Sequence, residues 1–235
     1  MKLAVIPARG GSKRIPRKNI KNFCGKPMIA WSIEVALASG CFEHIVVSTD
    51  DDYIAEVARE YGASVPFTRP DELSGDYIGT TPVVNHAIQW FIAQGIHPTH
   101  ICCLYATAPF VFAEDIQRGY ELLKSSDCDF ALSVASYGFP IQRAVRITKD
   151  ERLEMFSNEN FNTRSQDLEE AFHDAGQFYW GRAEAWLQGK MIFGSSSVPI
   201  RLPRHRVQDI DTPEDWLRAE WLFRAMKAQL GNMSE

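Results

Sequence analysis

The sequence lacks paired cysteines, long apolar runs and an excess of positive charge. Its five cysteines are odd in number and include no C-x-x-C, which predicts neither a disulfide framework nor a cysteine-based zinc site. No apolar run approaches the roughly 20 residues that a membrane helix needs, and the apolar start MKLAVIPA is too short for the core of a signal peptide. The formal net charge of -5 argues against a surface built to bind nucleic acid. We therefore expect a cytoplasmic protein that binds neither nucleic acid nor a membrane.

Hydrophobic patterning alternates between short strand-like runs and longer helical ones through most of the chain. Strands are expected at 2–7, 44–49, 100–105, 130–136, 177–180 and 196–202. Helices are expected at 26–39, 52–62, 81–94, 113–124 and 211–230. Asp50 or Asp51 is expected to cap the second helix, and Thr212 the last one. Because strands alternating with helices form right-handed βαβ units, residues 1–235 are predicted to form a single α/β domain around a mostly parallel sheet.

The alternation fails between residues 138 and 176. This segment is polar and has no clear hydrophobic period. We interpret it as an insertion into the domain. A long polar excursion is usually a lid, an interaction arm or a flexible loop, and the residues do not choose among the three.

A basic loop, RGGSKRIPRKNIK at residues 9–21, follows the first predicted strand directly. Ligands of open parallel sheets bind at the carboxyl ends of the strands, so this position favours a phosphate site over a solvated basic patch. Gly10, Gly11 and Ser12 allow close backbone approach, and Arg9 with two lysines of the loop can neutralise phosphate oxygens. The loop spells neither G-x-x-x-x-G-K-[ST] nor G-x-G-x-x-G, so it is a different cradle, suited to a triphosphate.

The stretch IPARGGSKRIPRKNI resembles the signature of the acylneuraminate cytidylyltransferase family, which activates sialic acid and related nine-carbon acid sugars. The resemblance extends through VVSTDD, TRP, DAGQFYW and QDIDTPEDW. It implies a Rossmann-like nucleotidyltransferase fold and transfer of CMP from CTP to the anomeric hydroxyl of the sugar, with release of pyrophosphate. It also implies that the insertion is an arm that reaches a partner subunit, and therefore a homodimer.

The resemblance assigns roles in binding CTP to residues of the basic loop. It places Arg9 and Lys18 on the phosphates, and Ser12 and Asn19 nearer the nucleoside. It places Arg69, in TRP, against the cytosine, whose O2 and N3 atoms need hydrogen-bond donors. The other basic side chains of the loop, Arg14, Arg17 and Lys21, match nothing essential in the signature, and we expect them to be solvated.

An acidic pair near the end of the chain supplies the opposite charge. Asp209 and Asp211 alternate along an extended segment, so both carboxylates face the same side and can bind a hard cation such as Mg²⁺. A helix cap is the alternative role for Asp211. The resemblance implies that this D-x-D pair is the metal site and that it forms the catalytic set with Arg9 and Lys18. The sequence does not identify which group acts as the general base.

Two departures from the sialic acid relatives concern the sugar. LYATAPF replaces their L-Q-P-T-S-P, so Tyr105 stands in place of a ligand-binding glutamine and Ala106 in place of a proline, and DAGQFYW replaces N-G-A-x-Y. Both departures resemble the branch that acts on pseudaminic acid, whose two acetamido groups and deoxygenated tail suit a less polar pocket wall. Neutral drift with no change of sugar is the alternative, and would leave N-acetylneuraminic or legionaminic acid as the substrate.

Four further residues are candidates for contacts with the sugar. Arg164 suits its carboxylate, with a surface ion pair to Glu169 or Glu170 as the alternative. Gln177, Tyr179 and Phe193 are also candidates, although both aromatic residues fit a core role equally well. A function of another class, a nucleotide-binding module without turnover, is disfavoured by the acidic pair, because a sensor needs no catalytic metal opposite the loop.

Overall fold

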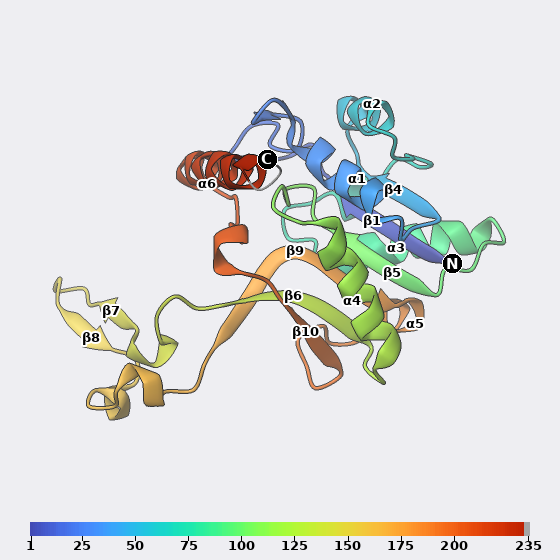
Figure 1. The fold of residues 1–235 in the computed structure, drawn as a ribbon. Helices are drawn as coiled ribbons and strands as arrows, with labels where there is room; N and C mark the ends of the chain where they lie inside the picture. The colour runs from blue at the N-terminus through green and yellow to red at the C-terminus, as the bar shows by residue number, and fades with distance from the viewer. Residues whose placement is uncertain (233–235) are drawn as a thin grey trace.

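A computed structural model describes residues 1–232 as one α/β body with a protruding arm (Figure 1). Its central sheet has the strand order β10-β6-β9-β5-β1-β4. The strands are β1 Lys2–Pro7, β4 His44–Ser48, β5 His100–Leu104, β6 Phe130–Ser136, β9 Phe172–Arg182 and β10 Ser197–Arg201. All neighbours pair in parallel except β9, which is antiparallel to both β5 and β6. The predicted mostly parallel sheet is thus confirmed.

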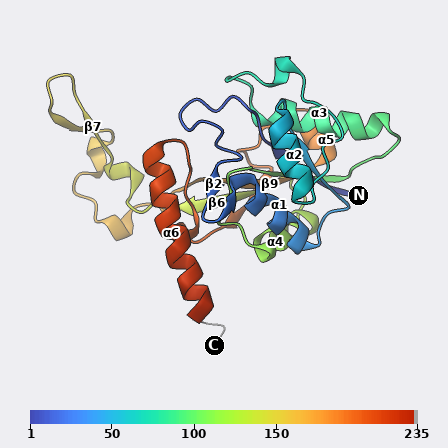
Figure 2. The same ribbon diagram turned by 90° about the horizontal axis from the view of Figure 1, so that it is seen from above.

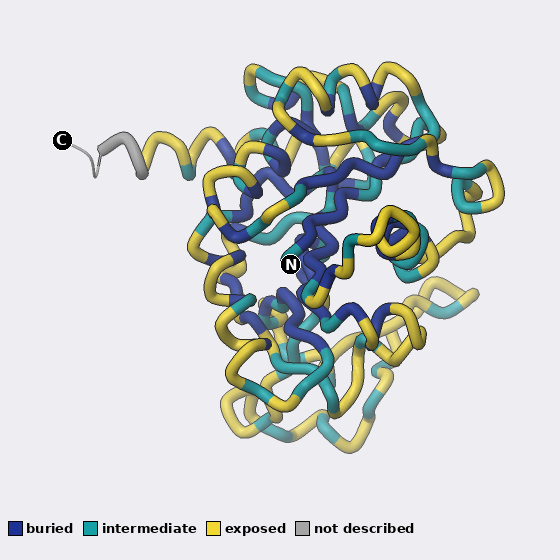
Figure 3. The backbone as a smooth tube through the Cα atoms, turned by 90° about the vertical axis from the view of Figure 1, so that its right-hand side faces the viewer, coloured by how far each residue is buried: buried dark blue, intermediate teal, exposed yellow. Residues whose placement is uncertain are grey.

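Helices cover both faces of the sheet. The helices are α1 Met28–Ser39, α2 Asp52–Glu60, α3 Thr80–Ala93, α4 Ala113–Ser125, α5 Ala183–Leu187 and α6 Pro213–Asn232. Successive side chains of β1 point to opposite faces of the sheet. Ala4 and Ile6 pack with α1, α2 and α4 on one face, whereas Leu3 and Val5 pack with α3 and α5 on the other. Figure 3 shows that the buried backbone is concentrated in these central strands. None of the described helices is long and apolar enough to cross a membrane.

The helix ends follow the capping rules. The Asp51 side chain accepts a hydrogen bond from the Ile54 N–H at 3.0 Å at the start of α2. The Thr212 hydroxyl accepts from the Asp215 N–H at 3.2 Å, and the Asp215 carboxylate accepts from the Thr212 N–H at 2.8 Å, which forms a capping box at the start of α6. The first helix begins two residues later than predicted, because Lys26 and Pro27 pair with a short strand instead.

Helix α6 packs on the basic loop and on the small hairpin that follows it, formed by β2 Asn22–Phe23 and β3 Lys26–Pro27. Trp216 and Phe223 contact the ring of Phe23 edge-on, with centroids 5.3 and 5.4 Å away. Figure 2 shows α6 crossing beside β2. This packing brings the first half of α6 to the loop after β1.

The segment between β6 and β9 projects from the body as an arm (Figures 1 and 2). It contains the hairpin of β7 Val145–Ile147 and β8 Leu153–Met155, together with short 3-10 turns. Residues 172–176, which we predicted to belong to the insertion, lie in β9, because Phe172, His173 and Asp174 pair with β6. The arm therefore ends earlier than its polarity indicated.

Candidate active site

The basic loop lines a pocket of about 510 Å³ at the carboxyl ends of β1 and β5. Residues from the loop, from the start of α3, from the end of β5 and from the approach to α6 meet there. Among the residues predicted from the sequence, those that line the pocket are Arg9, Ser12, Lys18, Asn19, Arg69, Tyr105, Ala106 and Asp211. The structure thus brings together most of the expected CTP site and one of the two expected metal ligands.

Two carboxylates hold the cations of the loop. The Lys18 ammonium donates to the Ile210 carbonyl oxygen at 2.7 Å and lies 3.2 Å from Asp211. On the other side of the pocket, Asp76 lies 2.8 Å from the Arg9 guanidinium and also pairs with Lys13. These bonds hold the pKa of Asp76 below its usual range, chiefly through the hydrogen bond from Lys13. The pocket is therefore a basic floor between two acidic edges.

Arg14 is exposed to solvent, as expected, but it also has a partner that the sequence did not indicate. Its guanidinium lies 2.6 Å from the Asp211 carboxylate, and it lines the pocket, although its side chain is largely exposed. Arg17 instead stacks over the ring of Tyr53, and Lys21 over the ring of Trp216, so both lie outside the pocket. Asp211 reaches Arg14 because α6 packs on the loop. The order of residues within the loop could not predict this contact.

Arg69 and Asn19 are buried in the pocket wall. Arg69 is 4% exposed, and its Nε donates to the Ser48 hydroxyl at 3.1 Å. Burial and the nearby Arg9 lower the pKa of Arg69 to about 10, so it keeps its charge at neutral pH. The Asn19 amide donates to the Arg9 carbonyl oxygen at 3.0 Å and so fixes the shape of the loop.

The two glycines of the loop do not line the pocket. The Gly10 N–H donates to the Asp50 carboxylate at 2.9 Å, and a Cβ on Gly10 would lie only 2.8 Å from the Asp51 carboxylate. The backbone at Gly10 therefore does make a close approach, but to the segment after β4 and not to the pocket. A side chain on Gly11 would meet nothing within 4 Å. Binding of a ligand by either glycine stays a prediction.

The acidic pair is divided between the pocket and its rim. Asp211 lines the pocket, whereas Asp209 is exposed beside it. Partial desolvation and the like charge of Asp211 raise the pKa of the Asp209 carboxyl, and Lys18 opposes that rise. Within residues 1–232, no group of three or more His, Cys, Asp or Glu side chains could hold a metal ion. Two carboxylates still fit Mg²⁺, which commonly takes one or two protein carboxylates and completes its shell with phosphate oxygens and water.

The expected sugar contacts are spread over several places. Tyr105 and Ala106 line the pocket, whereas Gln177 and Tyr179 are 2% and 3% exposed and lie behind its wall. The Gln177 amide donates to the Arg206 carbonyl oxygen at 2.5 Å. Phe193 is 56% exposed and contacts the ring of Tyr179 edge-on, outside the pocket. Contact of Gln177, Tyr179 or Phe193 with the sugar stays a prediction.

Arg164 lies in the arm, outside the pocket of its own chain. Its guanidinium pairs with Asp167 at 2.7 Å. Arg164 thus forms a surface ion pair, as in the alternative that we considered. Its partner is Asp167, however, and not Glu169 or Glu170. A contact of Arg164 with the sugar carboxylate stays a prediction.

Known structures share this fold. A CMP:2-keto-3-deoxy-manno-octonic acid synthetase in complex with CTP superposes with a TM-score of 0.68 and 18% identity, over 97% of this chain and 98% of that one. The 4-diphosphocytidyl-2C-methyl-D-erythritol synthase of Anaerococcus prevotii gives a TM-score of 0.61 at 12% identity, over 95% and 98% of the two chains. At such low identity these similarities establish the fold alone, which is that of the α/β nucleotidyltransferases.

Sequence comparison establishes the family. The sequence model described as cytidylyltransferase matches residues 3–202. The pseudaminic acid cytidylyltransferase of Campylobacter jejuni is 46% identical over 94% of this chain and 96% of its own. The CMP-N,N′-diacetyllegionaminic acid synthase of Legionella pneumophila is 35% identical over 94% and 95% of the two chains. The chain, with its basic loop set against Asp211, therefore belongs to the cytidylyltransferase family.

Proposed function

We propose that the protein transfers CMP from CTP to the anomeric hydroxyl of pseudaminic acid and releases pyrophosphate. The observation that carries this proposal is the 46% identity, over nearly the whole chain, to the pseudaminic acid cytidylyltransferase of Campylobacter jejuni. The pocket wall supports it, because Tyr105 and Ala106 stand where the sialic acid relatives carry more polar or more rigid residues. N-acetylneuraminic and legionaminic acids are the alternatives, and the Legionella relative favours the second.

The positions of the cations support binding of a triphosphate along the basic loop. Arg9, Lys13 and Lys18 surround the pocket floor, and phosphate oxygens would replace Asp76 as the partner of the first two. The oxygen of the anomeric hydroxyl attacks the α-phosphorus and its proton is released to solvent, while the bond from that phosphorus to the oxygen shared with the β-phosphate breaks and pyrophosphate leaves. The cations stabilise the charge that accumulates on the leaving group, and the walls hold the two reactants in line.

We assign Mg²⁺ to Asp209 and Asp211. Two acidic side chains one residue apart support this assignment. Partial burial, and after it the like charge of Asp211, raise the pKa of the Asp209 carboxyl, and a divalent cation would offset the part due to Asp211. When bound, the cation supplies Lewis-acid polarisation of the phosphate oxygens. Lys18 holds Asp211 in place from the loop, at 3.2 Å, and Arg14 does so at 2.6 Å.

We also propose that the protein is a homodimer joined through the arm. The arm carries large apolar side chains that its own chain leaves exposed by 64% or more: Phe139, Ile147, Leu153, Phe156 and Phe161. Such a surface is unusual on a monomer and is typical of an interface. Light scattering at micromolar concentration should give twice the mass of the 26.6 kDa chain, and a monomer would contradict the proposal.

The transfer itself is tested by release of pyrophosphate from CTP and Mg²⁺, with and without pseudaminic acid. We expect release only when both substrates are present. Release with ATP, GTP or UTP at a similar rate would contradict the assignment of the pocket to cytosine. No release with any acid sugar would favour a nucleotide-binding module without turnover.

A further inference from the structure

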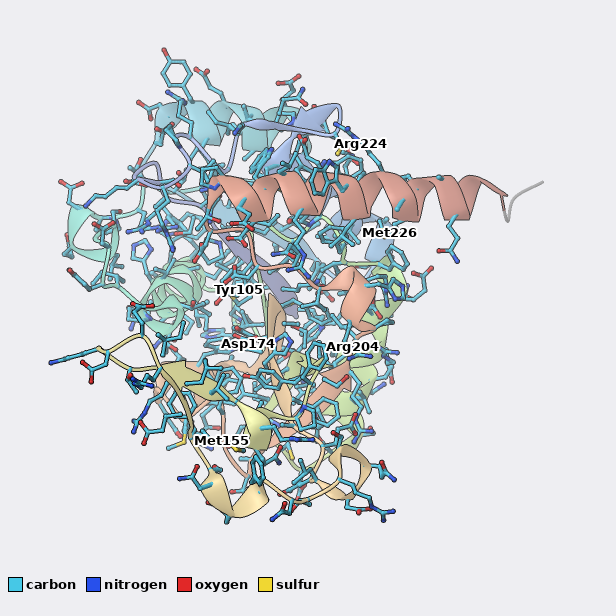
Figure 4. The ribbon with its side chains drawn as sticks, turned by 90° about the vertical axis from the view of Figure 1, so that its left-hand side faces the viewer. Tyr105, Met155, Asp174, Arg204, Arg224 and Met226 are labelled. Carbon is cyan, nitrogen blue, oxygen red and sulfur yellow. The ribbon has the colours of Figure 1, made fainter. Side chains whose placement is uncertain are left out.

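The hydroxyl of Tyr105, on the pocket wall, belongs to a chain of hydrogen bonds that runs away from the pocket. Its oxygen lies 3.3 Å from the Thr80 hydroxyl and 3.4 Å from the Tyr179 hydroxyl. The Tyr179 hydroxyl in turn donates to the carboxylate of Asp174. The two tyrosine rings meet edge-on, with centroids 5.5 Å apart. Figure 4 shows Asp174 close to Tyr105 near the middle of the molecule.

Asp174 sets the direction of this chain. An ionised carboxylate can only accept hydrogen bonds. One oxygen of Asp174 accepts from the Gly176 N–H at 2.8 Å, and the other accepts from the Tyr179 hydroxyl. The Tyr179 proton is therefore committed to Asp174, and the Tyr179 oxygen can only accept from Tyr105. The Tyr105 proton points away from the pocket, and its oxygen presents lone pairs to Thr80 and to the pocket.

The surroundings keep both hydroxyl groups protonated and in place. Burial raises the pKa of Tyr105, and burial together with Tyr105 and Asp174 raises the pKa of Tyr179. Neither tyrosine loses its proton at working pH, so the direction of the chain is maintained. The Tyr105 N–H donates to the Gln177 carbonyl oxygen at 2.8 Å, which ties the pocket wall to β9.

The fold explains why Asp174 reaches this place. Strand β9 runs antiparallel to β5 and β6, so its first residues lie at the edge where those strands end. The register of β6 against β9 shifts between Leu132 and Val134, and Gly176 adopts a left-handed φ of 60°. This irregularity lets Asp174 fold back over the Gly176 N–H and face Tyr179.

We propose that Asp174, acting through Tyr179, positions the Tyr105 hydroxyl as a hydrogen-bond acceptor on the pocket wall and thereby selects acid sugars that offer it an N–H or O–H donor. The inference rests on the proposed function and adds a specificity-determining residue to it. The N–H of an acetamido group is such a donor. Asp174 is a positioning residue, since it lies outside the pocket lining and acts on the sugar through two other side chains.

The variant Asp174→Asn tests the direction of the chain. Its carbonyl oxygen would still accept from the Gly176 N–H, which turns the amide NH₂ toward Tyr179. Because that group only donates, the chain reverses and the Tyr105 proton turns toward the pocket. We expect kcat/KM for the acid sugar to fall about tenfold or more, with KM for CTP changed less than about twofold. Asp127→Asn, which removes an exposed carboxylate between α4 and β6, should change neither.

A double-mutant cycle separates positioning from a general structural role. In a Tyr105→Phe background, Asp174→Asn should have no further effect on kcat/KM for the sugar. If Asp174→Asn fails to fold, Tyr179→Phe breaks the same chain without changing charge and should show the same dependence on Tyr105. An unchanged sugar kcat/KM in either variant, or an equal loss in the Tyr105→Phe background, would overturn the inference. Failure of the proposed function is distinct, because the wild-type protein would then release no pyrophosphate with any acid sugar.

Discussion

The Lys18 ammonium lies 3.2 Å from the Asp211 carboxylate, although the two residues are 193 positions apart in the chain. This contact joins the loop after β1 to the segment before α6 across the floor of the pocket. Lys18 is therefore placed to contact phosphate oxygens directly beside the carboxylate to which we assign the metal ion. Their placement depends on how α6 packs against the loop.

Asp211 is the first residue to test. We expect Asp211→Asn to lower kcat by about 100-fold or more, because the variant loses the charge that faces the phosphates and Lys18. Thermal unfolding should stay close to that of the wild type, since Asp211 is partly exposed. Glu214→Gln is the matched control: it removes an exposed carboxylate at the start of the same helix and should leave kcat unchanged. Near-normal turnover of Asp211→Asn would remove this residue from the site.

Two arginines of the basic loop should behave differently. Arg14→Gln should raise KM for CTP about tenfold, because Arg14 lines the pocket and a charge-assisted hydrogen bond is lost. Arg17→Gln should change it less than about twofold, because that side chain lies over Tyr53. Steady-state kinetics with varied CTP measure both. Equal effects would mean that the loop acts only through its total charge.

Asp76 pairs with two cations of the loop that we expect to bind CTP. In Asp76→Asn the ion pairs with Arg9 and Lys13 are lost, so we expect KM for CTP to fall about two- to fivefold at low salt. The gain should shrink at high ionic strength, where exposed pairs are screened. Asp71→Asn, in the neighbouring 3-10 turn, is the control. Weaker CTP binding by Asp76→Asn would show instead that Asp76 orders the loop for the nucleotide.

The packing of α6 should be essential for stability. Trp216 is 6% exposed and contacts Phe23 edge-on, so Trp216→Ala should lower the free energy of unfolding by about 3 kcal/mol. Trp221→Ala removes the same kind of side chain from the same helix, but Trp221 is 60% exposed, and about 0.5 kcal/mol or less is expected. Urea unfolding distinguishes the two. Similar stabilities would mean that α6 contributes little to holding the loop.

Local patterns in the sequence predicted most of the fold. Apolar runs such as KLAVIP gave the parallel strands, and Gly40 and Asp51 marked helix ends because capping is a local effect. The antiparallel placement of β9 was not predicted, nor was the short helix α5 that follows it. Both depend on which strands neighbour one another in space, and no local period encodes that relationship.

The lining of the pocket was predicted where a short motif supplies its residues, including Arg69 and Asp211 far from the loop. The basic loop is such a motif, and Arg9, Ser12, Lys18 and Asn19 all line the pocket. Partners that come from distant segments were missed: Asp76 opposite Arg9, and Asp174 behind Tyr105. Asp76 lies outside every motif that we identified, and Asp174, although it begins DAGQFYW, carries no local sign of its partner. Only the folded chain brings each carboxylate to the side chain that it contacts.

The central claim is most directly tested by competition among acid sugars. One reaction mixture with CTP and Mg²⁺ would contain three acid sugars at equal concentration: pseudaminic, N-acetylneuraminic and N,N′-diacetyllegionaminic acids. Mass spectrometry would measure the initial rate at which each CMP-sugar forms. Their ratio equals the ratio of kcat/KM values. We predict that CMP-pseudaminic acid forms at least about tenfold faster than either rival. Faster formation of either rival product would contradict the account of the Tyr105 wall.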